Sequence, residues 1–308
     1  MFLYCWFTWE DNVSRGTCVK SVVITGRKRF FIIMKYLELK DYSVTEDAFA
    51  LIYDEDLDLL KTSPQPSQSE LPRFYESENY ISHTSNKRSL FEMVYHWVRE
   101  FAVKSKVNLI NEKQPKGNLL DIGAGTGDFL NAAKLDGWLI NGVEPNSNAR
   151  NLAVEKGLVI NETTSALQAN SFDVITMWHV FEHVPNYDEQ ILELKRLLKP
   201  SGIIIIAVPN YKSYDAKHYK EYWAAYDVPR HLWHFSKISI EKIFSVHDLV
   251  LKEVKPMKFD SYYVSLLSEK YKTGKMNFLK AFAIGLKSNL DAIKTSEFSS
   301  HIYVIERA

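Results

Sequence analysis

The chain has 308 residues, enough to bury a substantial core, and its 38 Lys and Arg residues balance its 38 Asp and Glu residues. This balance excludes a global electrostatic field that would draw the protein to nucleic acid or to an anionic membrane, so we expect a small-molecule partner. The two cysteines, Cys5 and Cys18, have a spacing that fits neither a zinc site nor a disulfide framework, which is compatible with a cytoplasmic protein.

The first third of the chain is expected to lie outside the main domain. Residues 1–33 show no sustained period of 2 or 3.6, and we expect them to be poorly ordered or a non-native extension ahead of Met34. The alternative is a short β-rich arm at residues 18–25. Residues 34–112 are predicted to form a strap, interrupted by a turn-prone stretch at 62–67, and then a cofactor-covering helix with an apolar stripe over 88–107.

Residues 119–130, LLDIGAGTGDFL, combine an apolar run, an acid and three glycines spaced two apart. Gly123, Gly125 and Gly127 lack a Cβ, so the chain can turn tightly and bring its backbone close to a ligand at the start of the next helix. Asp121 would lie at the carboxyl end of the preceding strand, where open α/β sheets hold ligands. The dinucleotide fingerprint G-x-G-x-x-G does not fit, because its last glycine would fall on Asp128, whose carboxylate would repel pyrophosphate.

Strand and helix patterns alternate over residues 118–210 and predict a parallel sheet with helices on both faces. The continuous apolar runs at 172–177 and 203–208 suit strands that are buried on both sides. Further along, the pattern predicts a helix at 239–246 and strands at 249–257 and 301–306. A helical insertion at 261–300 separates the last two strands, and we interpret it as a substrate lid or a dimer contact.

The acid followed by G-x-G-x-G resembles motif I of the class I S-adenosylmethionine (SAM) methyltransferases, and later segments follow that family's order. Residues 138–144 look like its second strand with a terminal acid, residues 171–183 like motif IV, and residues 197–210 like the turn and fifth strand. The resemblance implies an α/β fold with a Rossmann-like seven-stranded sheet, mostly parallel with an antiparallel last strand. Helices would cover both faces, an N-terminal helical extension would precede the sheet, and the methyltransferase domain would span residues 113–308.

The same resemblance implies SAM as the cofactor and indicates which residues would hold it. Glu144 matches the acid that takes both ribose hydroxyls, the glycine loop would hold the methionine part, and the backbone at Trp178 and His179 would meet the amino group. A stretch ahead of the core resembles one in bacterial methyltransferases in which a Tyr-rich turn lies near SAM, with purely structural aromatics as the alternative. The implied cofactor-binding residues are Asp121, Gly123, Ala124, Gly125, Gly127, Glu144, Pro145, Trp178, Tyr80 and His83.

The string HVFEH at residues 179–183 has two metal-based interpretations. As H-x-x-E-H it matches a zinc-protease signature, but that motif needs a helix, and Pro185 follows too closely. It is also similar to the E-x-x-E-H element of ubiquinone-pathway O-methyltransferases and small-RNA 3′-end methyltransferases, in which related residues hold a divalent cation. His179 departs from that pattern, because a Glu stands there in the family, so a metal-assisted reaction through His179, Glu182, His183 and His231 is the alternative rather than the prediction.

We therefore predict no bound metal and interpret His183 as a base or a hydrogen-bond partner of the substrate. The alternative is that Glu182 and His183 only cap the end of the strand through hydrogen bonds. His179 is a second candidate for the catalytic machinery, because it follows the fourth strand directly.

Residues 211–235 are dense in aromatic side chains with polar tips and follow the fifth strand, where acceptors bind in this family. Within them, DVPRHLWHF resembles a D-x-P-x-H-x-x-x-F element common beside small-molecule methyltransferase sites. Asp227 and His231 are therefore predicted to contact the acceptor.

The predicted function is methyl transfer from SAM to a small-molecule acceptor, with neither nucleic acid nor a membrane as partner and a homodimer as a candidate assembly. Three alternatives stay open from the sequence. They are a metal-assisted O-methyltransferase, a non-catalytic SAM-fold binding protein and a metal hydrolase.

Overall fold

The structure is a computed structural model that describes residues 17–24, 27–67, 69–75 and 90–308, with side chains from residue 34 onward except those of 68, 72 and 76–99. The chain forms two compact units, each of which is described by itself. Unit 1 comprises Met1–Ser77, Asn210–Ser239 and Phe259–Ser299. Unit 2 comprises Glu78–Pro209, Ile240–Lys258 and Ser300–Ala308.

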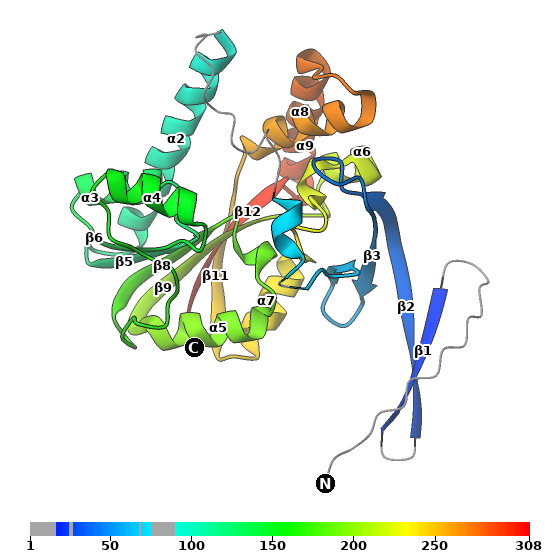
Figure 1. The fold of residues 1–308 in the computed structure, drawn as a ribbon, viewed down its shortest axis with the longest axis horizontal. Helices are drawn as coiled ribbons and strands as arrows, with labels where there is room; N and C mark the ends of the chain where they lie inside the picture. The colour runs from blue at the N-terminus through cyan, green and yellow to red at the C-terminus, as the bar shows by residue number, and fades with distance from the viewer. Residues whose placement is uncertain (1–16, 25–26, 68, 76–89) are drawn as a thin grey trace. The chain divides into compact units, whose positions relative to one another are not determined.

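Unit 2 is built on a seven-stranded sheet in the order β11-β12-β9-β8-β5-β6-β7 (Figure 1). Neighbours from β9 to β7 are parallel, whereas β12 runs antiparallel to both β9 and β11. This topology confirms the predicted Rossmann-like sheet. Its strands are β5 (Asn118–Ile122), β6 (Leu139–Val143), β7 (Ile160–Asn161), β8 (Phe172–Trp178), β9 (Leu198–Pro209), β11 (Leu249–Pro256) and β12 (Ser300–Arg307).

Helices cover both faces of this sheet, as the alternating pattern predicted. Side chains of α2 (Leu90–Lys113), α3 (Asp128–Leu135) and α4 (Ser147–Glu155) share a buried cluster with those of β5, β8 and β9. α5 (Tyr187–Leu197) lies on the other side of the sheet from α3 and α4 (Figure 1). The predicted helix at 239–246 is α7 (Lys237–Ser245), and its Phe244 ring packs 5.5 Å from that of Phe181.

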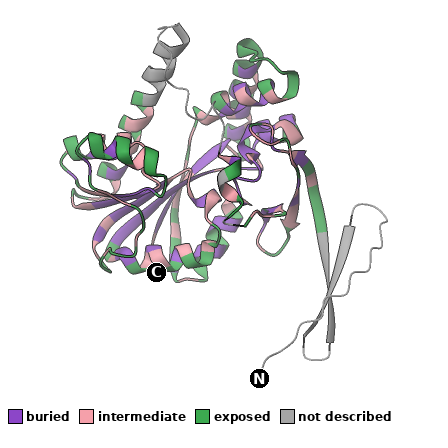
Figure 2. Cartoon of the chain, in the orientation of Figure 1, coloured by how far each residue is buried: buried purple, intermediate pink, exposed green. Residues whose placement is uncertain are grey.

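The central strands are buried because both of their faces are covered. Residues 203–208 of β9 are no more than 2% exposed, as expected for a strand between two helical layers, and Figure 2 shows the buried strands in purple. Asparagine side chains begin two of the covering helices. Asn146 accepts from the backbone N–H of Ala149 at α4, and Asn186 does the same for Asp188 at α5, which satisfies donors left unpaired at a helix start.

Unit 1 contains a five-stranded sheet in the order β1-β2-β3-β4-β10. Its strands are β1 (Thr17–Ile24), β2 (Arg27–Lys40), β3 (Ala48–Asp54), β4 (Leu59–Ser63) and β10 (Trp233–His234). Its helices are the short η1 (Leu71–Phe74), η3 (Lys220–Tyr222) and η4 (Ala224–Tyr226), and α6 (Tyr214–Tyr219), α8 (Asp260–Thr273) and α9 (Phe278–Thr295). The insertion at 261–300 is therefore helical, as predicted.

Two features of unit 1 bear on the domain boundaries predicted from the sequence, which remain a prediction. β1 lies within the stretch predicted as a poorly ordered extension or a β-rich arm, and β2 runs through the boundary expected at residue 33. Residues 211–235 and 261–300 were assigned to the methyltransferase domain, but they group with the N-terminal strands. The reason is a shared core, in which Tyr211, Tyr219, Trp223 and Tyr226 join Leu39, Phe49, Leu51 and Leu60.

Candidate functional site

The glycine loop joins β5 to α3 at the carboxyl edge of the sheet of unit 2. Gly123, Gly125 and Gly127 have φ values of 73°, 55° and 77°, which other residues adopt only with strain. A Cβ on Gly123 would lie 2.3 Å from Val180 Cγ2, and one on Gly127 would lie 2.4 Å from Leu158 Cδ1, so protein packing also requires these two glycines. A Cβ on Gly125 would meet no atom within 4 Å. Gly125 therefore leaves space through which a ligand can approach the backbone.

The backbone N–H groups of this loop bond within the protein. Those of Gly123 and Ala124 donate to Val143 O at 2.7 and 3.0 Å, and that of Gly127 donates to Ala124 O at 2.9 Å. These bonds fix the loop against the end of β6. The loop therefore offers a ligand close approach to the chain, and these three amides are not free donors.

Glu144 follows β6 directly and lies beside the loop. Its side chain is buried, with one carboxylate oxygen accepting from Gly125 N and the other from Asn146 N, both at 2.8 Å. A carboxylate has about four acceptor positions, so about two remain for hydroxyl donors. Arg150 donates to the carbonyl oxygens of Glu144 and Pro145 at 2.6 and 3.0 Å, which fixes the turn that carries the acid. A carboxylate held in this way can accept further hydrogen bonds from hydroxyl groups of a ligand.

Asp121 is a second buried acid at the same edge. Burial raises its pKa to about 7, against the lowering effects of a hydrogen bond from Thr176 and of the Lys106 charge. Thr176 Oγ1 donates to Asp121 Oδ1 at 2.6 Å, because the two residues are register partners on β5 and β8. A partly charged carboxylate in this position favours a ligand group that carries positive charge.

Trp178 and His179 mark the end of β8. The Trp178 ring packs edge-on against Phe129 of α3 at 5.5 Å, and Lys106 Nζ lies 4.5 Å from the Trp178 ring centroid. His179 has a positive φ of 57°, and its N–H donates to Ala207 O at 2.9 Å. A cofactor ammonium group donates hydrogen bonds, so any backbone contact with it here would be made by carbonyl oxygens and not by this N–H.

Glu182 and His183 belong to η2 (Phe181–His183), a three-residue 3-10 turn. A zinc-protease H-x-x-E-H motif needs both histidines on one face of a longer α-helix, so the turn contradicts that interpretation. Glu182 is buried and places Oε1 3.3 Å from His179 Nδ1, and His183 is half-buried. His231, which the metal-assisted alternative also required, belongs to unit 1 and is described with that unit below.

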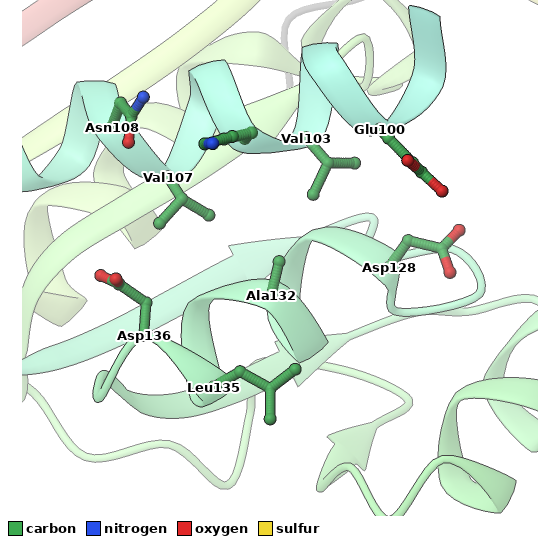
Figure 3. A pocket seen from close by; sticks show the side chains of 9 residues that line it. Glu100, Val103, Val107, Asn108, Asp128, Ala132, Leu135 and Asp136 are labelled. Carbon is green, nitrogen blue, oxygen red and sulfur yellow. The ribbon is translucent and has the colours of Figure 1, made fainter. Parts of the chain in front are cut away.

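A pocket of about 620 Å³ lies elsewhere in unit 2, between α2 and α3 (Figure 3). Val103 and Val107 of α2 point toward Ala132 of α3, and acids lie around these apolar side chains. Asp128 at this rim accepts from Lys156 Nζ at 2.7 Å. This pocket is distinct from the glycine loop and Glu144, and no residue predicted from the sequence as a site residue lines it.

The predicted acceptor residues Asp227 and His231 lie in unit 1. Asp227 forms an ion pair with the buried Arg230 at 2.7 Å, and Arg230 also pairs with the buried Asp41 at 2.8 Å. His231 Nδ1 lies 2.9 Å from Ala225 O, so this nitrogen carries the proton and the ring orientation is fixed. The Asp227 carboxylate therefore already has Arg230 as a partner, and a methyl acceptor that contacted Asp227 would share the carboxylate with Arg230.

The sequence-predicted cofactor residues come together on unit 2, with two exceptions. Tyr80 and His83 lie outside the described residues. Sequence reasoning missed Thr176, Lys106 and Asn146, although a lone threonine in the apolar run FDVITMW was a usable signal for a polar contact inside the sheet.

Comparisons with known proteins identify the family of the chain. The family described as "Methyltransferase domain" matches residues 94–254. A ubiquinone biosynthesis O-methyltransferase of Haemophilus ducreyi is 30% identical over 170 residues, which cover 50% of this chain and 71% of that protein. The chain is 32% identical to the Histophilus somni protein of the same name, with the match covering 35% of this chain and half of the relative's length.

A solved structure shows the same fold. Phosphoethanolamine N-methyltransferase 2 of Haemonchus contortus, in complex with SAM, aligns with a TM-score of 0.50 at 17% identity, covering 98% of this chain and 71% of that one. The family match and the Haemophilus ducreyi relative show that the chain belongs to the class I SAM-dependent methyltransferase family. In the part of the chain that the structure describes, no helix is both long and apolar enough to span a membrane.

Proposed function

We propose that this protein transfers the methyl group of SAM to a small-molecule acceptor by in-line displacement, with Glu144 as the ribose anchor. The observation that carries the proposal is the Glu144 carboxylate, which two backbone N–H groups hold at 2.8 Å beside the open space at Gly125. The residues fit the cofactor by charge as well. Glu144 and Asp121 are acids at one sheet edge, and SAM carries a sulfonium and an ammonium.

The reaction needs positioning more than covalent help from the enzyme. When bound, SAM supplies an electrophilic methyl group on sulfur. The acceptor atom would form its bond to the methyl carbon as the carbon–sulfur bond broke, and the bonding pair would stay on the sulfur of S-adenosylhomocysteine. Alignment of these three atoms lowers the barrier without an enzyme-bound intermediate.

His183 is the group we assign to the acceptor's proton. It is half-buried on η2, directly after β8, and so lies at the carboxyl edge that carries Glu144 and Asp121. A hydroxyl or amine acceptor loses its proton as the new bond forms, and a neutral imidazole is suited to take it. His179, Asp227 and His231 remain candidates for contacts with the acceptor.

The test of the ribose assignment is Glu144→Ala with calorimetry. Because hydrogen bonds to a charged group contribute roughly 1.5–3 kcal/mol, SAM affinity should fall at least about tenfold. Glu155→Ala, a nearby exchange at the end of α4, serves as the matched control and should bind SAM as the wild type does. Wild-type affinity in a folded Glu144→Ala protein would remove the assignment.

The acceptor class is tested by incubating the protein with labelled SAM and a fractionated metabolite extract, followed by mass spectrometry of the labelled product. A labelled small molecule supports the proposal. SAM binding without any labelled product would instead favour the non-catalytic binding protein.

A further inference from the structure

One face of α9 carries a row of large apolar side chains in contact with solvent. Leu279, Phe282, Leu286, Leu290 and Ile293 are 87%, 60%, 40%, 54% and 72% exposed. Successive members are three or four residues apart, so they form one continuous stripe along the helix. Soluble proteins seldom leave such a row uncovered, and a contiguous exposed apolar surface of this kind marks an interaction site.

The opposite face of α9 already has its partner within unit 1. Small residues line it, and Ala281, Gly285, Ser288 and Ala292 are buried. A Cβ on Gly285 would lie 3.0 Å from the backbone of Tyr262 in α8, which shows how closely the two helices pack. The apolar stripe is therefore surplus to the core of unit 1, and Figure 2 shows much of this helical pair in green.

Lysines accompany the stripe. Lys280, Lys287 and Lys294 recur every seven residues, which places them in a second row beside the apolar one. Lys270, Lys272 and Lys275 add charge at the end of α8 and in the turn before α9. Residues 260–295 hold these six lysines and only three acids, of which Glu269 is fully buried and paired with Lys280. The surface is basic although the whole chain is neutral.

We propose that the α9 stripe lies in the headgroup region of an anionic lipid bilayer, with the helix parallel to the membrane plane. An amphipathic helix with leucine and phenylalanine on one side and lysines beside them has the chemistry that binds such surfaces. Anionic headgroups complement the lysine rows, whereas a second copy of the chain would bring its own lysines against them. This proposal replaces the expectation, drawn from overall charge, that no membrane is a partner.

Cosedimentation of the full chain with vesicles tests the proposal. Vesicles containing about a third phosphatidylglycerol in phosphatidylcholine should pull down the protein, and pure phosphatidylcholine should retain at least tenfold less. Added salt at about 0.5 M should release it, because the lysine contribution is screened. Lys287→Gln with Lys294→Gln should weaken binding about tenfold or more, and Leu279→Gln with Ile293→Gln should do the same.

Matched control variants test whether binding depends on the α9 surface or only on the overall charge and exposed apolar area of the protein. Lys242→Gln with Lys252→Gln removes the same charge from exposed positions outside α8 and α9, and Leu139→Gln with Leu192→Gln removes two exposed leucines. Both control proteins should bind the vesicles as the wild type does, and circular dichroism should show every variant folded. Equal loss in test and control pairs would overturn the proposal. So would a wild type that stays in the supernatant, or a dimer in sedimentation velocity that Leu279→Gln with Ile293→Gln converts to monomer.

Discussion

Asp121 combines two properties that rarely occur together in a carboxyl group: it is buried, and its pKa is about 7 because burial disfavours its charge. In the unfolded chain an aspartate titrates near 3.9. Between these values the folded protein holds a proton that the unfolded chain has lost, so this group's contribution to stability is full below about pH 4 and is lost as the pH rises through 7.

We therefore expect Asp121→Asn to flatten this pH dependence. At pH 8 the variant should be more stable than the SAM-free wild type, by on the order of 1–3 kcal/mol, while at pH 4 the difference should shrink. Denaturant unfolding at both pH values measures it. An unchanged slope of stability against pH would show that Asp121 is charged in the folded protein.

Burial favours the protonated form of Asp121, whereas a ligand that carries positive charge favours the ionised form, because it binds the carboxylate more tightly. SAM affinity in the wild type should therefore rise as the pH increases from about 5.5 to 7.5, by up to tenfold per unit below the pKa. Titration calorimetry across this range should show a weaker dependence in Asp121→Asn. Identical pH profiles would exclude Asp121 from the electrostatics of binding.

At the same residue scale, sequence reasoning identified the acids but missed their partners. Glu144 and Asp121 could be predicted from the sequence because each ends an apolar run with the pattern of a strand. Thr176 and Lys106 were not, because their roles come from the register of β5 with β8 and from the packing of α2, which no local pattern encodes.

At the scale of elements, the turn from β5 to α3 contains two kinds of glycine. A Cβ on Gly123 or Gly127 would clash with neighbouring side chains, whereas one on Gly125 would meet no atom. Gly127→Ala would place a Cβ 2.4 Å from Leu158 and 3.0 Å from Ala153 at a φ of 77°, so it should destabilise the protein by about 2–4 kcal/mol. Gly125→Ala meets no atom, and the strain of its φ should cost only about 1 kcal/mol.

The two variants should therefore separate stability from binding. Gly125→Ala is expected to stay folded and yet bind SAM at least tenfold more weakly, since the methyl group enters the space beside Glu144. Thermal unfolding and calorimetry on both proteins provide the comparison. Wild-type affinity in Gly125→Ala would mean that the ligand approaches the loop elsewhere.

A buried ion pair connects two elements of unit 1. Burial alone would raise the pKa of Asp41, but the hydrogen bond and charge of Arg230 and the backbone N–H groups of Thr45 and Ser43 lower it to about 2. The stabilisation is present above about pH 4 and is lost as the pH falls through 2. Asp41→Ala should destabilise the protein by about 3–5 kcal/mol, because Arg230 would lose one of its two carboxylates.

Chemical denaturation at pH 7 checks this value. Asp47→Ala removes an acid from an exposed pair with Arg73 and should change stability by less than about 1 kcal/mol. Equal effects of the two substitutions would show that the pair with Arg230 contributes no more than a surface contact.

Across the whole molecule, the part of the fold predicted best is the part whose contacts are local in sequence order. β5 to β9 alternate with their covering helices, so period and spacing were sufficient to place them. Unit 1 was not recognised because its sheet pairs β4 with β10, in which Leu60 lies opposite His234. A two-residue strand inside an aromatic segment carries no periodic signal, and only the tertiary core of Tyr211, Trp223 and Leu60 explains it.

The discontinuous make-up of unit 1 bears on how the protein is made. Its strands β2, β3 and β4 leave the ribosome before the aromatic residues that complete their core, which follow after position 210, and before α8 and α9, which follow after 259. While the Rossmann-like sheet is being synthesised, the apolar sides of these three strands lack the aromatic residues that bury them in the folded protein. Closing such long loops is slow. We therefore expect the nascent chain to depend on chaperones until α8 and α9 have emerged.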